Sequence, residues 1–315
     1  MVRFRRLAVV SAAALYAIIV SGATVRLTSS GLACESWPGC EPGSFFPASS
    51  HHGFVEFGNR IVSLFPIAFT LATWWVGRRT AGVPRWVVWL AGLTFLGTIA
   101  QAPLGFVTIL TDLHPLMVMT HFLLALAVLA GGVAVAVEAW RLDRGAAAPI
   151  GPPLVRRGGL IVAAAALALV VTGTLATAAG PHPGGSEVER LGNLVDAVYV
   201  HVRATAVYGI GLLLLVVYLV RRGGRAATLS LALLGFVLAQ MAVGETQWRT
   251  QLPWGLVLVH VSLAAAVWAL TVLLVYVLWR PPRGLAETGH GGRNREYVPS
   301  WPSENRAAQG RREHS

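Results

Sequence analysis

The stretch QMAVGETQWRTQLPWGLVLVH, residues 240–260, has a counterpart earlier in the chain, QAPLGFVTILTDLHPLMVMTH, residues 101–121. In both stretches a glycine follows the first glutamine by four residues and a histidine follows it by twenty, at an offset of 139 residues. VSGATVRLTSSG at 20–31 and VTGTLATAAG at 171–180 extend the similarity. Matched polar residues within apolar sequence indicate an internal duplication, which predicts two similar halves lying parallel in one membrane.

Composition places this repeat in a lipid bilayer. Of the 315 residues, 55% are hydrophobic and 12% are charged, which is too apolar for a soluble domain. Eight runs are long enough to cross a bilayer, and they must be helical because lipid offers no partner to an unpaired backbone group. The runs are residues 7–27, 57–77, 86–108, 117–139, 158–178, 197–220, 227–247 and 255–279. The sequence therefore predicts an all-α polytopic membrane protein, with eight transmembrane helices arranged as two pseudo-symmetric four-helix bundles.

The net charge of +11 comes from arginine, since the chain has no lysine. A basic chain can bind nucleic acid, but here most arginines flank the apolar runs on one side, which is the signal of cytoplasmic loops. They are Arg3, Arg5, Arg6, Arg78, Arg79, Arg85, Arg141, Arg144, Arg156, Arg157, Arg221, Arg222, Arg225, Arg280 and Arg283. We therefore expect a multi-pass protein of the cell (plasma) membrane with both termini in the cytoplasm and no nucleic-acid partner.

The same runs set the expected domain boundaries. Residues 1–140 form an N-terminal four-helix half and residues 158–280 a C-terminal four-helix half. The segment RLDRGAAAPIGPPLVRR, residues 141–157, is the cytoplasmic linker between them. Residues 281–315 are rich in proline, glycine and charge without any apolar period, which predicts a disordered cytoplasmic tail.

Two histidines, His201 and His260, lie inside spans of the second half, at similar depth from the side opposite the arginines. A buried histidine often makes only a helix–helix hydrogen bond. Two imidazoles at one depth instead predict a shared metal, and the iron of a six-coordinate b-type haem fits them better than zinc, for which Glu245 offers only a weak third ligand. Arg203 and Arg249, near the same mouth, are candidates for the haem propionates or for ordinary positioning at the lipid–water boundary.

The first half carries a changed version of this pair. VEFGNR at 55–60 aligns with VYVHVR at 198–203, so Asn59 stands opposite the first of the two histidines to within one residue. His121 alone would leave an iron with an open or weakly held position. This predicts a haem that binds here as substrate, with Asn59 and Arg60 beside it.

Glu56 precedes Asn59 by about one helical turn and is the candidate catalytic carboxylate of this half. It is placed to accept a proton or to stabilise positive charge at a reacting carbon. An ion pair between Glu56 and Arg60 at the start of the helix is an alternative that is compatible with this role.

The two cysteines of the chain, Cys34 and Cys40, fall in the first loop on the side opposite the arginines. In an oxidising compartment this spacing predicts a local disulfide. A small exposed ring of this kind is either structural or redox-active.

Taken together, these features resemble the haem A synthase family, in its bacterial, actinobacterial type, over about residues 5–280. The motifs are GATVRLTSSGLACESWPGC after the first span, the VEFGNR helix start, His121 within MTHFLLAL, GTLATAAGPHPGG after the fifth span, and AVGETQWRTQLPWGLVLVH. The resemblance implies an oxidoreductase of haem biosynthesis and cytochrome oxidase assembly. Such an enzyme converts the C8 methyl of haem O to a formyl group in two successive hydroxylations.

The resemblance also implies a b-type haem held by His201 and His260, and functional roles for Glu56 and His121. This chain departs from the family at Asn59, where many members have a histidine. It departs again in the loop PHPGGSEVERLGN, 181–193, which lacks the second cysteine pair that some members carry.

Two other functions remain open at this stage. One is a membrane b-type cytochrome that shuttles electrons from quinol without modifying haem, which would favour two bis-histidine sites. The other is a transporter, which would favour broken helices near the midplane. The lipid bilayer is the partner that the sequence requires. The electron donor, homo-oligomer formation and docking of a haem O synthase stay open.

Overall fold

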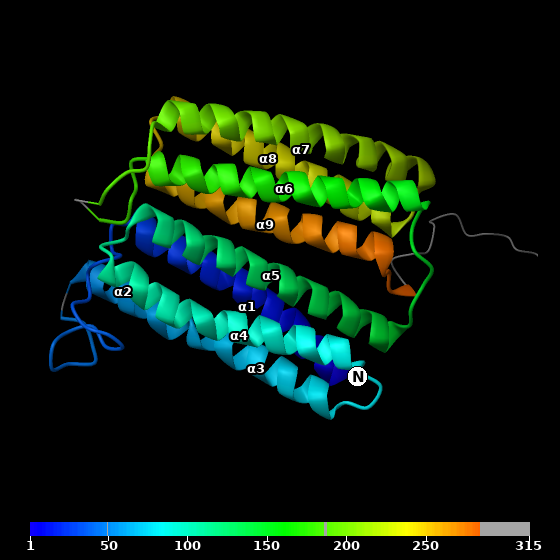
Figure 1. The fold of residues 1–315 in the computed structure, drawn as a ribbon, viewed down its shortest axis with the longest axis horizontal. Helices are drawn as coiled ribbons and strands as arrows, with labels where there is room; N and C mark the ends of the chain where they lie inside the picture. The colour runs from blue at the N-terminus through cyan, green and yellow to red at the C-terminus, as the bar shows by residue number, and fades with distance from the viewer. Residues whose placement is uncertain (49, 186–187, 284–315) are drawn as a thin grey trace, which may run out of the picture.

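The structure is a computed structural model that describes residues 1–48, 50–185 and 188–283, and this part of the chain is a bundle of α-helices (Figure 1). The helices are α1 (Val2–Leu27), α2 (His51–Val62), α3 (Leu64–Arg79), α4 (Arg85–Leu110), α5 (Pro115–Arg144), α6 (Pro153–Ala179), α7 (Leu194–Arg222), α8 (Arg225–Arg249) and α9 (Trp254–Trp279). Because α2 and α3 together form one span, eight segments are long and apolar enough to cross a membrane. The predicted all-α fold with eight membrane spans is confirmed. The predicted disordered tail lies outside the described residues from residue 284 onward.

The second span differs from the single helix that was predicted over 57–77. In the structure α2 ends at Val62 and α3 begins at Leu64. Pro66 explains the break, because a proline ring clashes with the carbonyl four residues before it and has no N–H to donate. Pro103, by contrast, lies inside α4 without interrupting it.

Each half of the protein is a ring of four spans. In the first half α1 and α4 each pack on α3 and α5, and in the second half α6 and α8 each pack on α7 and α9. Figure 1 shows the two groups side by side with their helices nearly parallel. The halves meet where α5 packs on α9, flanked by the equivalent contacts of α1 with α9 and of α5 with α6. This pattern is what a two-fold axis along the bundle produces.

The turn before the last helix of each half has the same unusual backbone. Asp112 and Leu113 have φ values of 49° and 58°, and Gln251 and Leu252, 139 residues later, have φ values of 64° and 59°. Residues other than glycine rarely adopt this left-handed region. Its recurrence at the same repeat position supports a duplication independently of the sequence match.

The two ends of the bundles are packed differently. We call the end where α1, α4, α6 and α8 begin the arginine end, and the opposite end, which carries the cysteine loop, the disulfide end. Buried apolar side chains fill the middle and the arginine end of both halves. In the first half these include Phe4, Ala8, Val87, Ala91, Val135 and Ala139, and in the second half Tyr208, Leu212, Leu219, Leu233, Leu274 and Leu278. The predicted site residues lie nearer the disulfide end, away from this apolar packing.

A buried carboxylate joins the two halves at the arginine end. Glu138 on α5 is fully buried and accepts hydrogen bonds from Arg141 (3.3 Å), from the hydroxyl of Tyr276 on α9 (3.0 Å) and from Arg280. Such a network satisfies the carboxylate, which would otherwise be costly to bury. Glu138 therefore fixes the register of α5 against α9.

The predicted linker packs against the end of α9. Its backbone pairs with the chain that follows α9, through Ala147 N–H to Pro281 O (3.0 Å) and Arg283 N–H to Gly145 O (2.9 Å). Ile150 is buried and donates to Leu278 O at 2.9 Å. The linker thus ties the two halves together at the arginine end.

Candidate functional site

The second half brings the imidazoles of His201 on α7 and His260 on α9 close together near the disulfide end. Their ring centroids are 6.4 Å apart and the ring planes make an angle of 71°. With a metal–nitrogen bond of about 2 Å on each side, and with the half-width of each ring added, two imidazoles on one metal have centroids roughly 6 Å apart. The residues present therefore fit the two axial positions of one haem iron.

The hydrogen bonds of His201 fix which of its nitrogens faces the space between the rings. Thr172 on α6 donates its hydroxyl proton to the carbonyls of Ala168 and Leu169, both at 3.0 Å. Its oxygen is therefore the acceptor for Nδ1 of His201, at 3.3 Å. A proton on Nδ1 leaves Nε2 with a free lone pair, which is the tautomer that a metal ligand needs.

Both rings of the second half rest against a glycine on the neighbouring helix. A Cβ atom added to Gly173 of α6 would lie 3.0 Å from Cε1 of His201, and one added to Gly244 of α8 would lie 3.0 Å from Cε1 of His260. Real Cβ contacts are rarely this short. The two glycines therefore form cradles that let the imidazoles approach the helix backbone.

The first half keeps one of these cradles and lacks the other. A Cβ added to Gly105 of α4 would lie 3.4 Å from Cε1 of His121 on α5. Gly22 of α1 corresponds to Gly173 in the repeat, and an added Cβ there would meet no atom within 4 Å. Asn59 stands at the repeat position of His201 to within one residue. The first half thus offers one imidazole beside an open space.

Polar atoms in this part of the first half are buried without partners. Among the described residues these include Oδ1 of Asn59, Nδ1 of His121 and both amide atoms of Gln101. Buried polar groups normally find hydrogen-bond partners. A bound molecule with polar groups of its own would supply such partners.

Glu56 lies on α2, where its carboxylate is held on both sides. It is 4% exposed, and Oε2 accepts from the backbone N–H groups of Ala33 (2.8 Å) and Cys34 (2.9 Å). Oε1 accepts from Arg60 at 2.6 Å. The ion pair considered as an alternative reading of these residues is therefore formed. It leaves the catalytic role of Glu56 a prediction.

Arg60 connects Glu56 to the cysteine loop. Its guanidinium donates to the carbonyls of Ser36 (2.8 Å) and Gly39 as well as to Glu56. These bonds hold the loop over the start of α2. Arg60 therefore fixes the cysteine loop in place through these hydrogen bonds. Its contact with a substrate haem stays a prediction.

Cys34 and Cys40 are joined in a disulfide, as the sequence predicted, with a Cα–Cα distance of 4.3 Å. The two cysteines are 4% and 0% exposed and pack against Phe57. Thiol–disulfide exchange needs access to a sulfur. This burial favours the structural alternative over the redox-active one.

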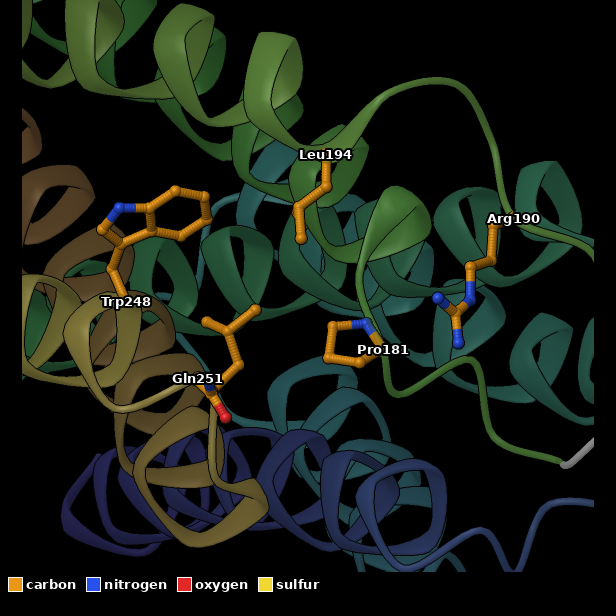
Figure 2. Close-up of a pocket in the computed structure, with 6 residues that line it drawn as sticks. Pro181, Arg190, Leu194, Trp248 and Gln251 are labelled. Atoms are coloured by element: carbon orange, nitrogen blue, oxygen red, sulfur yellow. The ribbon is translucent and has the colours of Figure 1, made fainter.

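A cavity of about 310 Å³ opens at the disulfide end of the second half (Figure 2). It is lined by Pro181, Arg190, Leu194, Trp248, Gln251 and Leu252. Leu194 is the first residue of α7 and His201 follows it by seven residues, so the cavity lies about 10 Å above the facing imidazoles at 1.5 Å per residue. A haem held by these histidines would turn its propionates toward this mouth.

Arg190 is the cation that lines this mouth, and the sequence analysis did not single it out. Arg203 is exposed and follows His201 by two residues, which places it about 200° around α7 from that ligand. Arg249 pairs with Glu245 at 2.5 Å on the surface, where their side chains are 76% and 58% exposed. The sequence does contain one signal for Arg190, because few arginines lie on the disulfide side of the spans.

Zinc does not fit the second half. Over the described ranges of the chain, no three His, Cys, Asp or Glu side chains come together as metal ligands. Glu245, the weak third ligand considered from the sequence, is exposed and engaged by Arg249. The donor set is two imidazoles, which suits the axial positions of a haem rather than a tetrahedral zinc.

Comparison with known proteins identifies the family of the chain. Residues 5–180, more than half of the chain, match the family described as cytochrome oxidase assembly protein, which contains the haem A synthases. The chain belongs to this family. It is accordingly a multi-pass membrane protein, and its first four spans with α6 lie within the matched residues, whereas His201 and His260 lie beyond them.

Two haem A synthases are among its relatives. The protein from Bacillus licheniformis is 31% identical over 121 residues, which are 37% of this chain and 38% of that protein. The protein from Lysinibacillus sphaericus is 29% identical over 140 residues, or 44% of this chain and 45% of that protein. The matched stretches therefore span less than half the length of either relative.

Proposed function

We propose that this chain is a haem A synthase that oxidises the C8 methyl of haem O to a formyl group in two successive hydroxylations. Family membership supports the reaction class. The observation that carries the proposal is the asymmetry between the halves, since two facing imidazoles 6.4 Å apart in one half correspond to a single imidazole beside open space in the other. The second half is suited to a permanently bound haem, and the first half to a haem that binds as substrate.

In this proposal His201 and His260 would hold a haem b, and Arg190 would pair with its propionates. A haem b held in this way supplies one-electron transfer. Thr172 orients His201 through Nδ1, and the glycine cradles set the position of both rings.

The first half would bind haem O as substrate, through His121 and with Asn59 at the opposite face. Asn59 is a poor iron ligand, so its side leaves room for chemistry beside the ring. Arg60 and Glu56 lie on the same segment of α2. The two backbone amides and Arg60 hold the Glu56 carboxylate in one orientation.

A carboxylate fixed in this way is suited to stabilise positive charge that develops on a methyl carbon, because a preorganised charge needs no reorientation during the reaction. The surrounding low dielectric strengthens the effect. We therefore keep Glu56 as the candidate catalytic residue.

The arginine end is proposed to face the cytoplasm and the disulfide end the outer side of the cell membrane. The arginines that flank the spans support this orientation. The disulfide supports it as well, because such bonds persist in oxidising compartments.

An electron-shuttling b-type cytochrome is the weaker candidate. It would need a second pair of facing ligands, and the first half has Asn59 and an open Gly22 where the second has His201 and Gly173. A transporter would place breaks at matching positions in both halves, but the break between α2 and α3 has no counterpart in α7.

The test is pigment extraction from a host that makes haem O and lacks a haem A synthase of its own. Expression of this chain should convert part of the extracted haem O to haem A, whereas the same host with an empty vector should contain none. Membranes that hold the chain and a low-spin b-type spectrum but only haem O and haem B would refute the proposed activity and favour the electron shuttle.

A further inference from the structure

Gln101 of α4 is a buried polar residue without a role in the site described above. It precedes Gly105 by four residues, so both lie on the face of α4 that meets His121. Both its Nε2 and Oε1 atoms are buried without a hydrogen-bond partner. An amide with two unsatisfied ends in an apolar bundle is costly unless a ligand pairs with it.

Gln101 lies deeper in the bundle than His121. It is nine residues from the end of α4 at Leu110, or about 13 Å, whereas His121 is six residues from the start of α5 at Pro115, or about 9 Å. Side chains lean toward the N-terminus of their helix. This moves the amide of Gln101 toward the arginine end and the imidazole of His121 toward the disulfide end. The difference in depth between the two groups is therefore larger than the difference between their backbone positions.

The expected orientation of the substrate follows from charge. Propionates are carboxylates, which are costly to place in the bilayer interior, so they turn to the disulfide end where Arg60 lies. The opposite rim of the ring then points toward the arginine end, on the far side of the iron. Gln101 lies at that level. In haem O this rim carries a hydroxyl group at the base of the isoprenoid chain, whereas haem B has an apolar vinyl group there.

We propose that Gln101 hydrogen-bonds the hydroxyl of the isoprenoid-bearing side chain of haem O and thereby selects haem O over haem B in the first half. The inference rests on the proposed function and extends it to substrate selection. A hydroxyl both donates and accepts, so either amide atom of Gln101 can pair with it. Haem B would leave both unpaired, and a site built for a hydroxyl rejects the analogue that lacks it.

The test compares Gln101→Leu with the wild type in detergent-purified full-length chain whose second-half site is saturated with haem b. Haem O and haem B are titrated separately, and first-half binding is followed by absorbance difference spectra. Leucine has similar volume but cannot hydrogen-bond. We expect the affinity for haem O to fall about tenfold. The affinity for haem B should stay within about twofold of wild type or rise.

Gln240→Leu is the matched control, because Gln240 occupies the same register on α8, four residues before Gly244. It should leave the ratio of haem O to haem B affinity in the first half unchanged. Equal losses of both haems in Gln101→Leu, or a wild-type ratio in that variant, would overturn the inference. If the wild type makes haem A but Gln101→Leu keeps the wild-type ratio of haem O to haem B affinity, only the role of Gln101 is refuted. A wild type that makes no haem A refutes the proposed function itself.

Discussion

Gly173→Ala is the sharpest test of the proposed haem b site, because it adds one methyl group beside a ligand. The new Cβ would lie 3.0 Å from Cε1 and 3.4 Å from Nδ1 of His201. Non-bonded carbon atoms prefer separations of about 3.5–4.0 Å. The imidazole must therefore retreat by roughly 0.5–1 Å, or the two helices must separate by as much.

A free histidine makes this adjustment easily, whereas a ligand does not. Metal–nitrogen distances hold to within about 0.2 Å in a good site. Even changes in the groups that orient a ligand typically cost about 10- to 100-fold in metal affinity. We expect Gly173→Ala to fold and insert normally but to bind haem b at least tenfold more weakly, with a shift from low-spin to high-spin iron.

Gly22→Ala is the control, since Gly22 is the repeat counterpart of Gly173 on α1 and an added Cβ there meets no atom within 4 Å. Both substitutions make the same change in helix propensity, so any difference between them reports on the cradle. The assay is haem content per purified chain with its absorption spectrum in both redox states. If Gly173→Ala retains the haem content and low-spin spectrum of Gly22→Ala, the two-imidazole site is refuted.

Three further outcomes are expected. Glu56→Gln should keep haem bound but lower haem A formation about 100-fold, because it removes a fixed charge; a normal yield of haem A in pigment extracts would exclude the role. Glu138→Gln should cost about 2 kcal/mol or more of stability, since it removes a buried charge from its cationic partners. Thermal inactivation in detergent measures this cost, and a loss no greater than that of the exposed pair variant Glu245→Gln would contradict it. Arg190→Gln should lower the midpoint potential of the haem b in a redox titration, because a cation near the ring favours the reduced iron; Arg203→Gln should leave it unchanged, and the reverse result would restore Arg203 as the propionate partner.

Much of the architecture could be predicted from the sequence. The eight spans followed from apolar length, because a bilayer forces such segments to be helical. The repeat followed from the matched Gln, Gly and His positions in two stretches 139 residues apart. The pairing of His201 with His260 was predictable because ionisable groups in a span turn inward, and equal depth then brings them together.

The sequence could not show which side chains share a face across different helices. It favoured Arg203 and Arg249 because both lie near the outer mouth of the spans, yet Arg203 is about 200° around α7 from His201, which lies two residues before it. Arg190 is eleven residues away in sequence, but the loop after α6 carries it to the mouth of the same half. The sequence also showed Glu56 and Arg60 as neighbours, but it did not reveal that the backbone amides of the cysteine loop donate to the Glu56 carboxylate.

The amino-acid sequence by itself therefore determined the number of spans, the duplication and the residue types of the two sites, since these depend on hydrophobicity and order along the chain. Tertiary structure alone decided the cradles at Gly173 and Gly244, the burial of the disulfide and the cation at the second-half mouth. The physical reason is that helix packing sets the rotation and depth of each helix. Those two quantities decide where a helix backbone comes so close to an imidazole that only glycine fits, and which charged side chain faces the site.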